Sequence, residues 1–302
     1  MQIVSAADER FAAHFATMLH SVWTQHPNAE LCLLDCGIEP GTLADLKGFA
    51  IARGIVLAII KIDITLLRHL PTTSQFSTAC YARLLIPDLL PGSIERVLYL
   101  DSDCVVVDDL TPLWQIEMGE AAIAAVNDPI GARLEREIGI HIDEQDYINS
   151  GVLMMNLPVW RRDKLAASAL AFLGAHQSCF ADQAGINVAC IRRTTLLSAE
   201  WNFLLHVHQH PQQWLEPKII HYSSAMKPWI HCDVPFAAIY LHHRNRTPFP
   251  IELPPPYRSK LRCALNLLVG RRKYWDRLKL VRRCDAFTAA YFGGLPRGAA
   301  SS

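Results

Sequence analysis

Several features that would narrow the class of protein are missing from this sequence. No apolar stretch approaches the roughly 18 uncharged residues that a membrane-spanning helix requires. The first residues, from Met1 to Asp8, lack the basic segment followed by an apolar segment that marks a secretory signal. We therefore expect the chain to stay in the cytoplasm.

Paired cysteines are missing as well. The nine cysteines are scattered from Cys32 to Cys284 and form no C-x-x-C motif, which is typical of reduced and mostly buried thiols. Cys32 and Cys36 flank a predicted strand end, but two isolated thiols are weak support for a metal site.

The composition excludes a disordered chain. With 302 residues, 51% of them hydrophobic and 19% charged, the chain can bury a large core, and it suits one sizeable α/β domain with an appendage. The net charge of zero conceals a division, because residues 257–302 hold 11 Lys or Arg and two acids. This segment therefore carries about +9 and the rest about −9, so we expect the two parts to have different roles.

Strand and helix patterns alternate along the chain. Residues 2–5 read as a strand, and Asp8 is expected to open an amphipathic helix. This alternation predicts a mostly parallel sheet with crossover helices. The further predicted strands are residues 30–34, 55–60, 96–100, 104–107 and 121–126, and the further predicted helices are residues 43–52, 78–86, 159–176 and 182–191.

Proline marks the end of this pattern. Five of the nine residues 248–256 are prolines, which cannot continue a helix or a central strand. We therefore divide the chain into a domain of residues 1–247, a stiff linker of residues 248–256 and a basic helical tail of residues 257–302.

Asp101-Ser102-Asp103 lies between two apolar runs, so two carboxylates leave what reads as a buried strand. Buried carboxylates require a cation, a proton or dense hydrogen bonding. The carboxyl ends of strands are also the usual ligand site of an open α/β sheet. The segment is a candidate metal site, and the alternative is a pair of hydrogen-bonded loop acids.

Two downstream residues could complete such a site. His221 follows a short apolar run, and an imidazole together with carboxylates suits Mn2+ better than Ca2+. Lys227 could add positive charge near a diphosphate whose charge the metal neutralises. The alternatives are a satisfied core histidine and a solvated lysine.

Asp182-Gln183 and Arg83 are candidates for the reacting centre. Cleavage at a sugar carbon generates positive character, which a carboxylate or polar group can stabilise. Asp182 could instead be an ordinary helix N-cap, and Arg83 could be a structural ion-pair donor rather than a substrate contact.

Taken together, the motifs resemble glycosyltransferase family 8, especially bacterial lipopolysaccharide galactosyl- and glucosyltransferases, from Ile3 to about Trp229. The landmarks are Val4-Ser5-Ala6-Ala7-Asp8, Tyr81-Ala82-Arg83-Leu84, Leu98-Tyr99-Leu100-Asp101-Ser102-Asp103, Asn149-Ser150-Gly151, Ala181-Asp182-Gln183, Trp201-Asn202, His221-Tyr222 and Lys227-Pro228-Trp229.

The resemblance implies a GT-A type α/β domain that uses a UDP-hexose and Mn2+, with Mg2+ as the alternative ion. It implies that Asp101, Asp103 and His221 bind the metal and that Gln183 and Asp182 serve catalysis. The implied contacts of the UDP-sugar are Ala6, Asp8, Arg83, Asp101, Ser102, Asp128, Asn149 and Lys227.

Three residues depart from the family pattern. Arg10 replaces a frequent Asn near the uridine, and Ser224 replaces a Gly that lets backbone approach the phosphate. Ala184 replaces an acid that often follows Asp-Gln, which argues against a nucleophile at that position. The choice between front-face attack and a covalent intermediate stays open.

The basic tail has three interpretations. Its Lys and Arg residues alternate with Leu278, Leu280 and Val281, which favours an anionic membrane surface as partner. A nucleic-acid partner is not expected, because no companion motif accompanies the charge. A solvated helix packed on the domain is the third interpretation.

These observations lead to one hypothesis and two alternatives. The hypothesis is a metal-dependent retaining hexosyltransferase that extends a saccharide or glycolipid acceptor, peripheral on the cytoplasmic face of the inner membrane. One alternative is a haloacid dehalogenase-like phosphohydrolase, because an Asp-x-Asp loop follows an apolar strand. The other is a membrane-docked nucleotide-binding protein without transfer activity.

Overall fold

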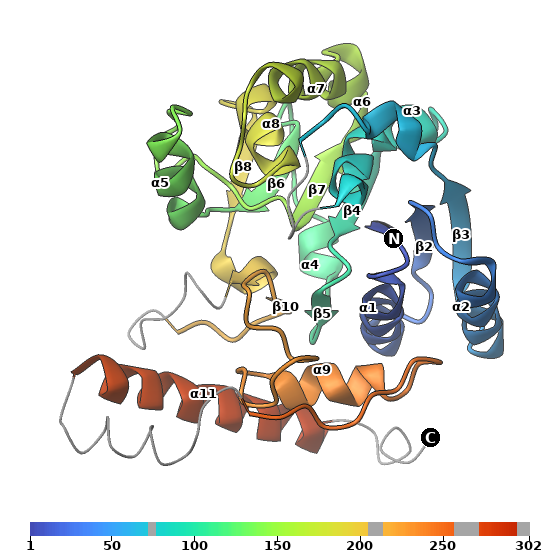
Figure 1. The fold of residues 1–302 in the computed structure, drawn as a ribbon, viewed down its shortest axis with the longest axis vertical. Helices are drawn as coiled ribbons and strands as arrows, with labels where there is room; N and C mark the ends of the chain where they lie inside the picture. Colours follow the sequence, from blue (N-terminus) through green and yellow to red (C-terminus); the bar gives the residue numbers. More distant parts are fainter. Residues whose placement is uncertain (72–76, 205–213, 257–271, 295–302) are drawn as a thin grey trace.

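The computed structural model describes residues 1–71, 77–204, 214–256 and 272–294. A large sheet with helices on its faces forms one part, and a small sheet joins it to the helices nearest the C-terminus (Figure 1). The predicted α/β class is therefore confirmed.

The large sheet has seven strands in the order β3-β2-β1-β4-β7-β6-β8. Four of its six strand pairs are parallel, and only β7 runs against both of its neighbours. The mostly parallel sheet is thus confirmed. The strands are β1 Gln2–Ala7, β2 Glu30–Asp35, β3 Val56–Lys61, β4 Arg96–Leu100, β6 Ile123–Val126, β7 Val152–Asn156 and β8 Thr194–Leu197.

The central strands are buried on both faces, which explains their continuous apolar runs. In β4, Val97 and Tyr99 pack into the core on one face, and Leu98 and Leu100 pack into the core on the other. Asp101 follows directly, so the chain leaves the core at a carboxylate.

The helices follow the strands as the periodicity predicts. In α1, Phe15, Met18, Leu19 and Val22 recur at helical spacing and are all fully buried. The α-helices are α1 Ala12–Gln25, α2 Pro40–Ala52, α3 Ile86–Leu89, α4 Thr111–Trp114, α5 Pro129–Glu137, α6 Leu157–Arg162, α7 Leu165–Ala175, α8 Asp182–Ala189, α9 Ala237–Arg244 and α11 Arg272–Gly294. The 3-10 helices are η1 Ile64–Leu67, η2 Thr78–Leu85 and η3 Ala199–Asn202.

A second sheet of three strands continues from the exit of β4. Its strands are β5 Cys104–Val106, β10 Ile219–His221 and β9 Phe203–Leu204. β5 and β10 are antiparallel, and His221 lies opposite Cys104. This pairing brings residues that are far apart in the sequence to one place.

The C-terminal helices cover the outer face of the small sheet (Figure 1). Leu280 and Cys284 of α11 pack with Tyr240 of α9 and Val105 of β5 in one apolar cluster. The described part of the tail therefore packs on the domain. Residues 257–271 and 295–302 of the predicted tail lie outside the described residues.

Three local predictions were wrong. The predicted helix of residues 159–176 is two helices, because Lys164 has a left-handed backbone with a φ of 52°. The helix assigned to begin at Asp8 begins at Ala12, and residues 78–86 form mainly a 3-10 helix. Within the described residues, no helix has the length and apolar character needed to cross a membrane.

Candidate active site

The reversed strand β7 brings polar residues from three strands to one edge of the sheet. Asp101 follows β4, Asp128 follows β6 and Asn149 precedes β7. Because β7 is antiparallel to β4, its beginning lies beside the end of β4, where the Asp101 amide donates to the Gly151 carbonyl at 2.8 Å. These residues therefore gather where open α/β sheets bind ligands.

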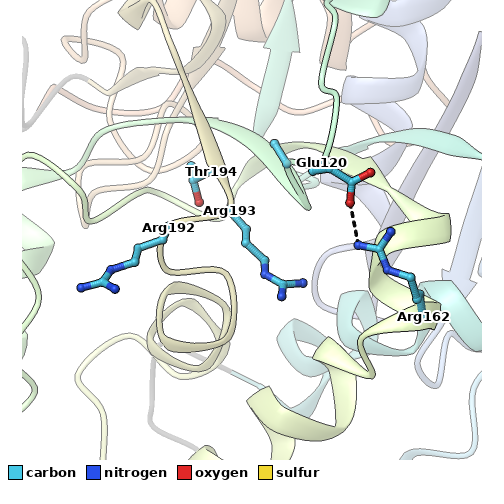
Figure 2. A pocket seen from close by; sticks show the side chains of 6 residues that line it. Glu120, Arg162, Arg192, Arg193 and Thr194 are labelled. Carbon is cyan, nitrogen blue, oxygen red and sulfur yellow. Dashed lines mark hydrogen bonds and ion pairs between the residues drawn. The ribbon is translucent and has the colours of Figure 1, made fainter.

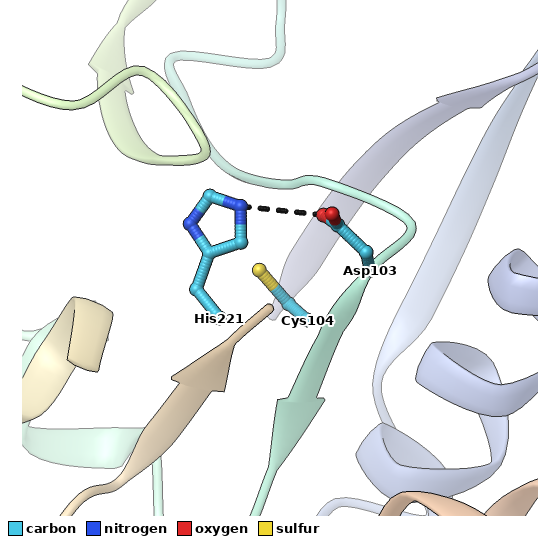
Figure 3. A group of neighbouring side chains, drawn as sticks. All are labelled: Asp103, Cys104 and His221. Atoms are coloured by element: carbon cyan, nitrogen blue, oxygen red, sulfur yellow. Dashed lines mark ion pairs between the residues drawn. The ribbon is translucent and has the colours of Figure 1, made fainter. Parts of the chain in front are cut away.

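Asp103 and His221 form the centre of the candidate metal site (Figure 3). The His221 Nε2 lies 3.2 Å from Asp103 Oδ1 and 3.8 Å from Asp101 Oδ2. The ligand atoms of Asp103, Cys104 and His221 all lie within 4.8 Å of one another. The structure thus brings the three predicted ligands together and adds a thiol beside them.

A chain of amides orients the imidazole. The His221 Nδ1 lies 2.9 Å from Asn202 Oδ1, and the Asn202 amide donates to Asn149 Oδ1 at 2.9 Å. Since a carboxamide oxygen only accepts, this contact assigns a proton to Nδ1 and makes Nε2 the nitrogen that faces the carboxylates. The outer contact thus prepares the histidine as a ligand.

Gly151 provides the space for this arrangement. A Cβ at residue 151 would lie 2.7 Å from His221 Nδ1 and 2.8 Å from Asp101 Oδ2, and would also overlap His221 Cε1. These distances are too short for real side chains. Only glycine lets the backbone pass this close to the two candidate ligands.

Lys227 completes the charge balance around Asp103. Its Nζ donates to Asp103 Oδ2 at 2.7 Å and to the Tyr222 carbonyl at 2.5 Å. Burial alone would raise the pKa of Asp103, but Lys227 and His221 outweigh burial and hold this pKa well below its usual range. Asp103 is therefore ionised, and Lys227 is a site residue rather than a solvated charge.

Arg83 bridges Asp101 and Asp182. Its guanidinium lies 2.9 Å from Asp101 Oδ1 and 2.9 Å from Asp182 Oδ2. It also donates to the Ser150 carbonyl at 2.6 Å and stacks 4.5 Å from the centre of the Tyr99 ring. Arg83 is thus an ion-pair donor, and its role toward a substrate stays a prediction.

The N-cap interpretation of Asp182 is wrong. Ala181 occupies the N-cap of α8 with a φ of 50°, and Asp182 is the first residue of the helix. Burial raises the pKa of Asp182 to about 6, since it outweighs the opposing charge of Arg83 and the negative charge of Asp101 raises the pKa further. This buried carboxylate therefore belongs to the ion-pair network.

Gln183 is held by hydrogen bonds at both ends of its amide. Its Oε1 accepts from the Ser150 amide and from Asn149 Nδ2, both at 3.1 Å, and its Nε2 donates to Asp128 Oδ2 at 3.3 Å. Because every member is buried, the orientation of the amide is set by the fold. The predicted residues Asp128, Asn149 and Gln183 form one cluster.

The remaining predicted residues lie at the end of β1. The Ser102 hydroxyl donates to the Ala6 carbonyl at 2.9 Å, which ties the Asp-x-Asp loop to β1. Asp8 is partly exposed, and its carboxylate accepts from the Phe11 amide at 3.1 Å ahead of α1. Its predicted contact with uridine stays a prediction.

A hollow lies at the opposite end of the sheet from the candidate site (Figure 2). It has a volume of about 310 Å³ and lies where Ala121 leads into β6 and Thr194 begins β8. In it, Arg162 pairs with Glu120 at 2.8 Å. Because β6 and β8 are parallel and begin here, this hollow is at their amino ends, away from the candidate site.

Asn202, Gly151 and Cys104 had no assigned role in the sequence. Asn202 and Gly151 stand in the landmarks Trp201-Asn202 and Asn149-Ser150-Gly151, which were the only available signal. Cys104 directly follows Asp103, but its approach to His221 depends on the pairing of β5 with β10.

This sheet order, with acids at the carboxyl ends of its central strands, defines a GT-A-like α/β protein. The chain belongs to glycosyl transferase family 8, whose model matches residues 2–232. The resemblance seen in the sequence is therefore confirmed, and the chain is a glycosyltransferase by family.

Solved and curated proteins agree with this assignment. The galactosyltransferase LgtC, solved in complex with donor and acceptor sugar analogs, is 25% identical and superposes with a TM-score of 0.71 over 83% of this chain and 98% of LgtC. General stress protein A of Bacillus subtilis (strain 168) is 27% identical over 269 residues, which cover 82% of this chain and 94% of that protein.

A third relative has a named reaction. Lipopolysaccharide 1,2-glucosyltransferase of Escherichia coli (strain K12) is 27% identical over 220 residues. The match covers 68% of this chain and 65% of the longer relative. The phosphohydrolase alternative finds no support in these comparisons or in the fold, where Asp101 follows the fourth strand along the chain.

Proposed function

We propose that this chain is a metal-dependent retaining hexosyltransferase. It moves galactose or glucose from a UDP-sugar to a saccharide acceptor, with lipopolysaccharide or another glycolipid as the acceptor class. The observation that carries the proposal is the convergence of Asp101, Asp103 and His221, with Lys227 at 2.7 Å from Asp103. Relatives named as glucosyl- and galactosyltransferases support the reaction class.

The donor atoms fit a hard divalent cation, with Mn2+ proposed and Mg2+ as the alternative. Two carboxylates and one imidazole nitrogen face the same point. A side chain at residue 151 would fill the space between Asp101 and His221, which we call the cradle. When bound, the ion would neutralise the charge that accumulates on the departing diphosphate. Because it needs only these ligands from the protein, positions remain for phosphate oxygens.

The side chains around the cradle would act on the diphosphate and the sugar. Lys227 would turn its ammonium from Asp103 to the diphosphate and would add positive charge where the leaving group departs. The amide of Gln183, fixed through Asn149 and Asp128, would face the sugar carbon and stabilise its developing positive charge. Arg83 would hold both acids in position.

The proposed reaction uses no carboxylate at residue 184. Ala184 is fully buried in the apolar cluster beside α5. Asp182, its near neighbour, is already bonded to Arg83. In this proposal Asp182 and Gln183 serve catalysis by charge and by position, and the side of attack is left open.

The proposal places the protein at the cytoplasmic face of the inner membrane. In the described part of α11, Lys279 and Arg282 are exposed, whereas Leu280 and Cys284 pack on the domain. The basic surface would bind anionic lipid headgroups. Lys279→Gln with Arg282→Gln is expected to weaken binding to vesicles that contain anionic lipid without changing UDP affinity. Unchanged vesicle binding would remove this part of the proposal.

A panel of UDP-sugars tests the function. With Mn2+ present, UDP-galactose or UDP-glucose is expected to release UDP in the presence of wild-type protein, and Asp103→Asn is expected to abolish the release. Normal turnover by Asp103→Asn would show that the metal assignment is wrong. UDP binding without release or transfer from any donor would favour the non-catalytic binding protein.

A further inference from the structure

We propose that Cys104 is an additional ligand at this site, so that the site binds a thiophilic divalent cation such as Zn2+ or Cd2+ through Asp103, Cys104 and His221. Such an ion would compete with Mn2+ and inhibit the enzyme. The inference rests on the proposed function only in that Asp103 and His221 hold a cation.

Strand pairing places the thiol. Cys104 and His221 are direct partners across the antiparallel pair of β5 and β10. Direct partners project from the same face of a sheet, with Cβ atoms about 4.5–5.5 Å apart. Their ligand atoms and the carboxylate of Asp103 lie within 4.8 Å of one another (Figure 3).

The alternation along the two strands confirms which way these side chains face. Val105 of β5 and Ile220 of β10 pack into the cluster beneath the C-terminal helices. Cys104 and its second neighbour Val106 pack into the cluster of the large sheet. The thiol therefore faces the large sheet, on the side where Asp101 and Gly151 lie.

The thiol has no strong interaction that would keep it from a metal. Cys104 is fully buried and forms no disulfide, and its Sγ lies 3.9 Å from the Gly151 carbonyl oxygen, a weak hydrogen bond. Many buried cysteines have only a packing role, as small apolar side chains. Here the same side chain lies beside an oriented imidazole nitrogen and an ionised carboxylate.

The donor set decides the type of ion. Sulfur, imidazole nitrogen and carboxylate oxygen together suit Zn2+ or Cd2+, whereas oxygen-rich sets suit Mn2+. Ligand bonds of about 2.0–2.3 Å place tetrahedral donors roughly 3.5 Å apart, and the three ligand atoms already lie within 4.8 Å of one another, with Asp103 Oδ1 and His221 Nε2 at 3.2 Å. On coordination the thiol proton passes to solvent, a sulfur-metal bond forms and no electron is transferred.

Cobalt provides a direct probe, because a cobalt-thiolate bond produces a charge-transfer absorption band in the near ultraviolet. Full-length wild-type protein titrated with Co2+ is expected to show this band, and Cys104→Val is expected to lose it. Cys104→Ala serves as a second variant in case valine disturbs the packing. Cys179→Ser is the matched control, since Cys179 is partly exposed and its Sγ lies beside the Leu134 carbonyl.

Calorimetry gives the second readout. Cys104→Val is expected to lower Cd2+ affinity by at least about 10- to 100-fold, the loss that follows removal of even an outer-shell partner. The control Cys179→Ser is expected to leave Cd2+ affinity and Mn2+-dependent UDP release unchanged. A cobalt band and a Cd2+ affinity that persist in Cys104→Val would overturn the inference while leaving the proposed function intact. Absence of Mn2+ binding in wild type would instead contradict the metal site itself.

Discussion

Two buried polar clusters satisfy the requirements of burial in different ways. The active-site cluster holds charged groups, with Arg83 between Asp101 and Asp182 and Lys227 beside Asp103. The second group, here called the histidine cluster, consists of His14, His20 and His243 with Tyr240 and Tyr291.

The histidine cluster remains neutral. His20 Nδ1 lies 2.8 Å from His243 Nδ1, and His243 Nε2 lies 2.8 Å from the Tyr291 hydroxyl. Burial, with help from Arg244 and Arg53 respectively, lowers the pKa of His14 and of His20 to about 3. These residues thus link α1, α9 and α11 by uncharged hydrogen bonds.

The difference between the charged and the neutral cluster indicates where this fold retains buried charge. Burying ions is costly unless each is paired and hydrogen-bonded. Arg83 and Lys227 provide such partners for the acids of the proposed site, whereas the histidine cluster uses neutral imidazoles. A buried histidine alone therefore does not indicate a ligand site, and His221 differs from the histidine cluster in that its Nε2 lies 3.2 Å from ionised Asp103.

The largest expected effect comes from adding one methyl group to the active-site cluster. Gly151→Ala would push His221 and Asp101 apart and is expected to abolish Mn2+-dependent UDP release. Gly48→Ala in α2 is the matched control, because nothing lies within 4 Å of its added Cβ. Equal UDP release by the two variants would contradict the conclusion that only glycine fits beside His221 and Asp101.

Removing the bridging charge is expected to cost stability. Arg83→Met leaves Asp101 and Asp182 without their cation, which should lower the free energy of unfolding by about 3–5 kcal/mol in urea titrations. Arg133→Met, which removes an exposed pair with Glu144, should cost far less, because solvent screens that pair. Similar losses for both variants would show that Arg83 is not a structural bridge.

Acid is expected to destabilise the protein through the histidine cluster. Between pH 6.5 and about 3, His14 and His20 bind protons in the unfolded chain but not in the native protein. As the pH is lowered through this range, the free energy of unfolding therefore falls by up to about 1.4 kcal/mol per pH unit for each histidine. Asp182, with its pKa raised to about 6, acts in the opposite direction but is a single group. Chemical denaturation that shows higher stability at pH 5 than at pH 7 would contradict this balance.

The smallest effect is expected when one tyrosine hydroxyl is removed from each cluster in turn. Tyr291→Phe removes the hydroxyl that is hydrogen-bonded to His243 Nε2. It should lower the free energy of unfolding by about 1 kcal/mol without changing UDP release. Tyr99→Phe removes a hydroxyl that donates to Asp101 at 3.0 Å, so it should reduce UDP release. A loss of activity in Tyr291→Phe alone would reverse the assignment of the two clusters.

Much of the fold followed from local patterns. The alternation of strand and helix patterns predicted a mostly parallel sheet, and the acids that follow residues 96–100 predicted a ligand site at the carboxyl end of that strand. The helix break at Lys164 was missed, because no proline or glycine marks the left-handed residue.

The contacts within the site were less accessible from sequence. Asp182 was weighed as an N-cap because its partner Arg83 lies almost a hundred residues earlier in the chain. The close approach of Gly151 to His221, and of Cys104 to the same ring, depends on how two sheets meet. Sequence patterns describe neighbours along the chain and not such tertiary distances.

The central claim is that Asp103 and His221 hold a divalent cation that binds the diphosphate of a UDP-sugar. Calorimetric titration of UDP into the full-length protein, with and without Mn2+, tests it most directly. We expect binding that requires Mn2+ and is lost in Asp103→Asn but kept in Asp109→Asn, which changes an exposed acid of the same segment. UDP binding of equal strength without Mn2+, or in Asp103→Asn, would contradict the claim.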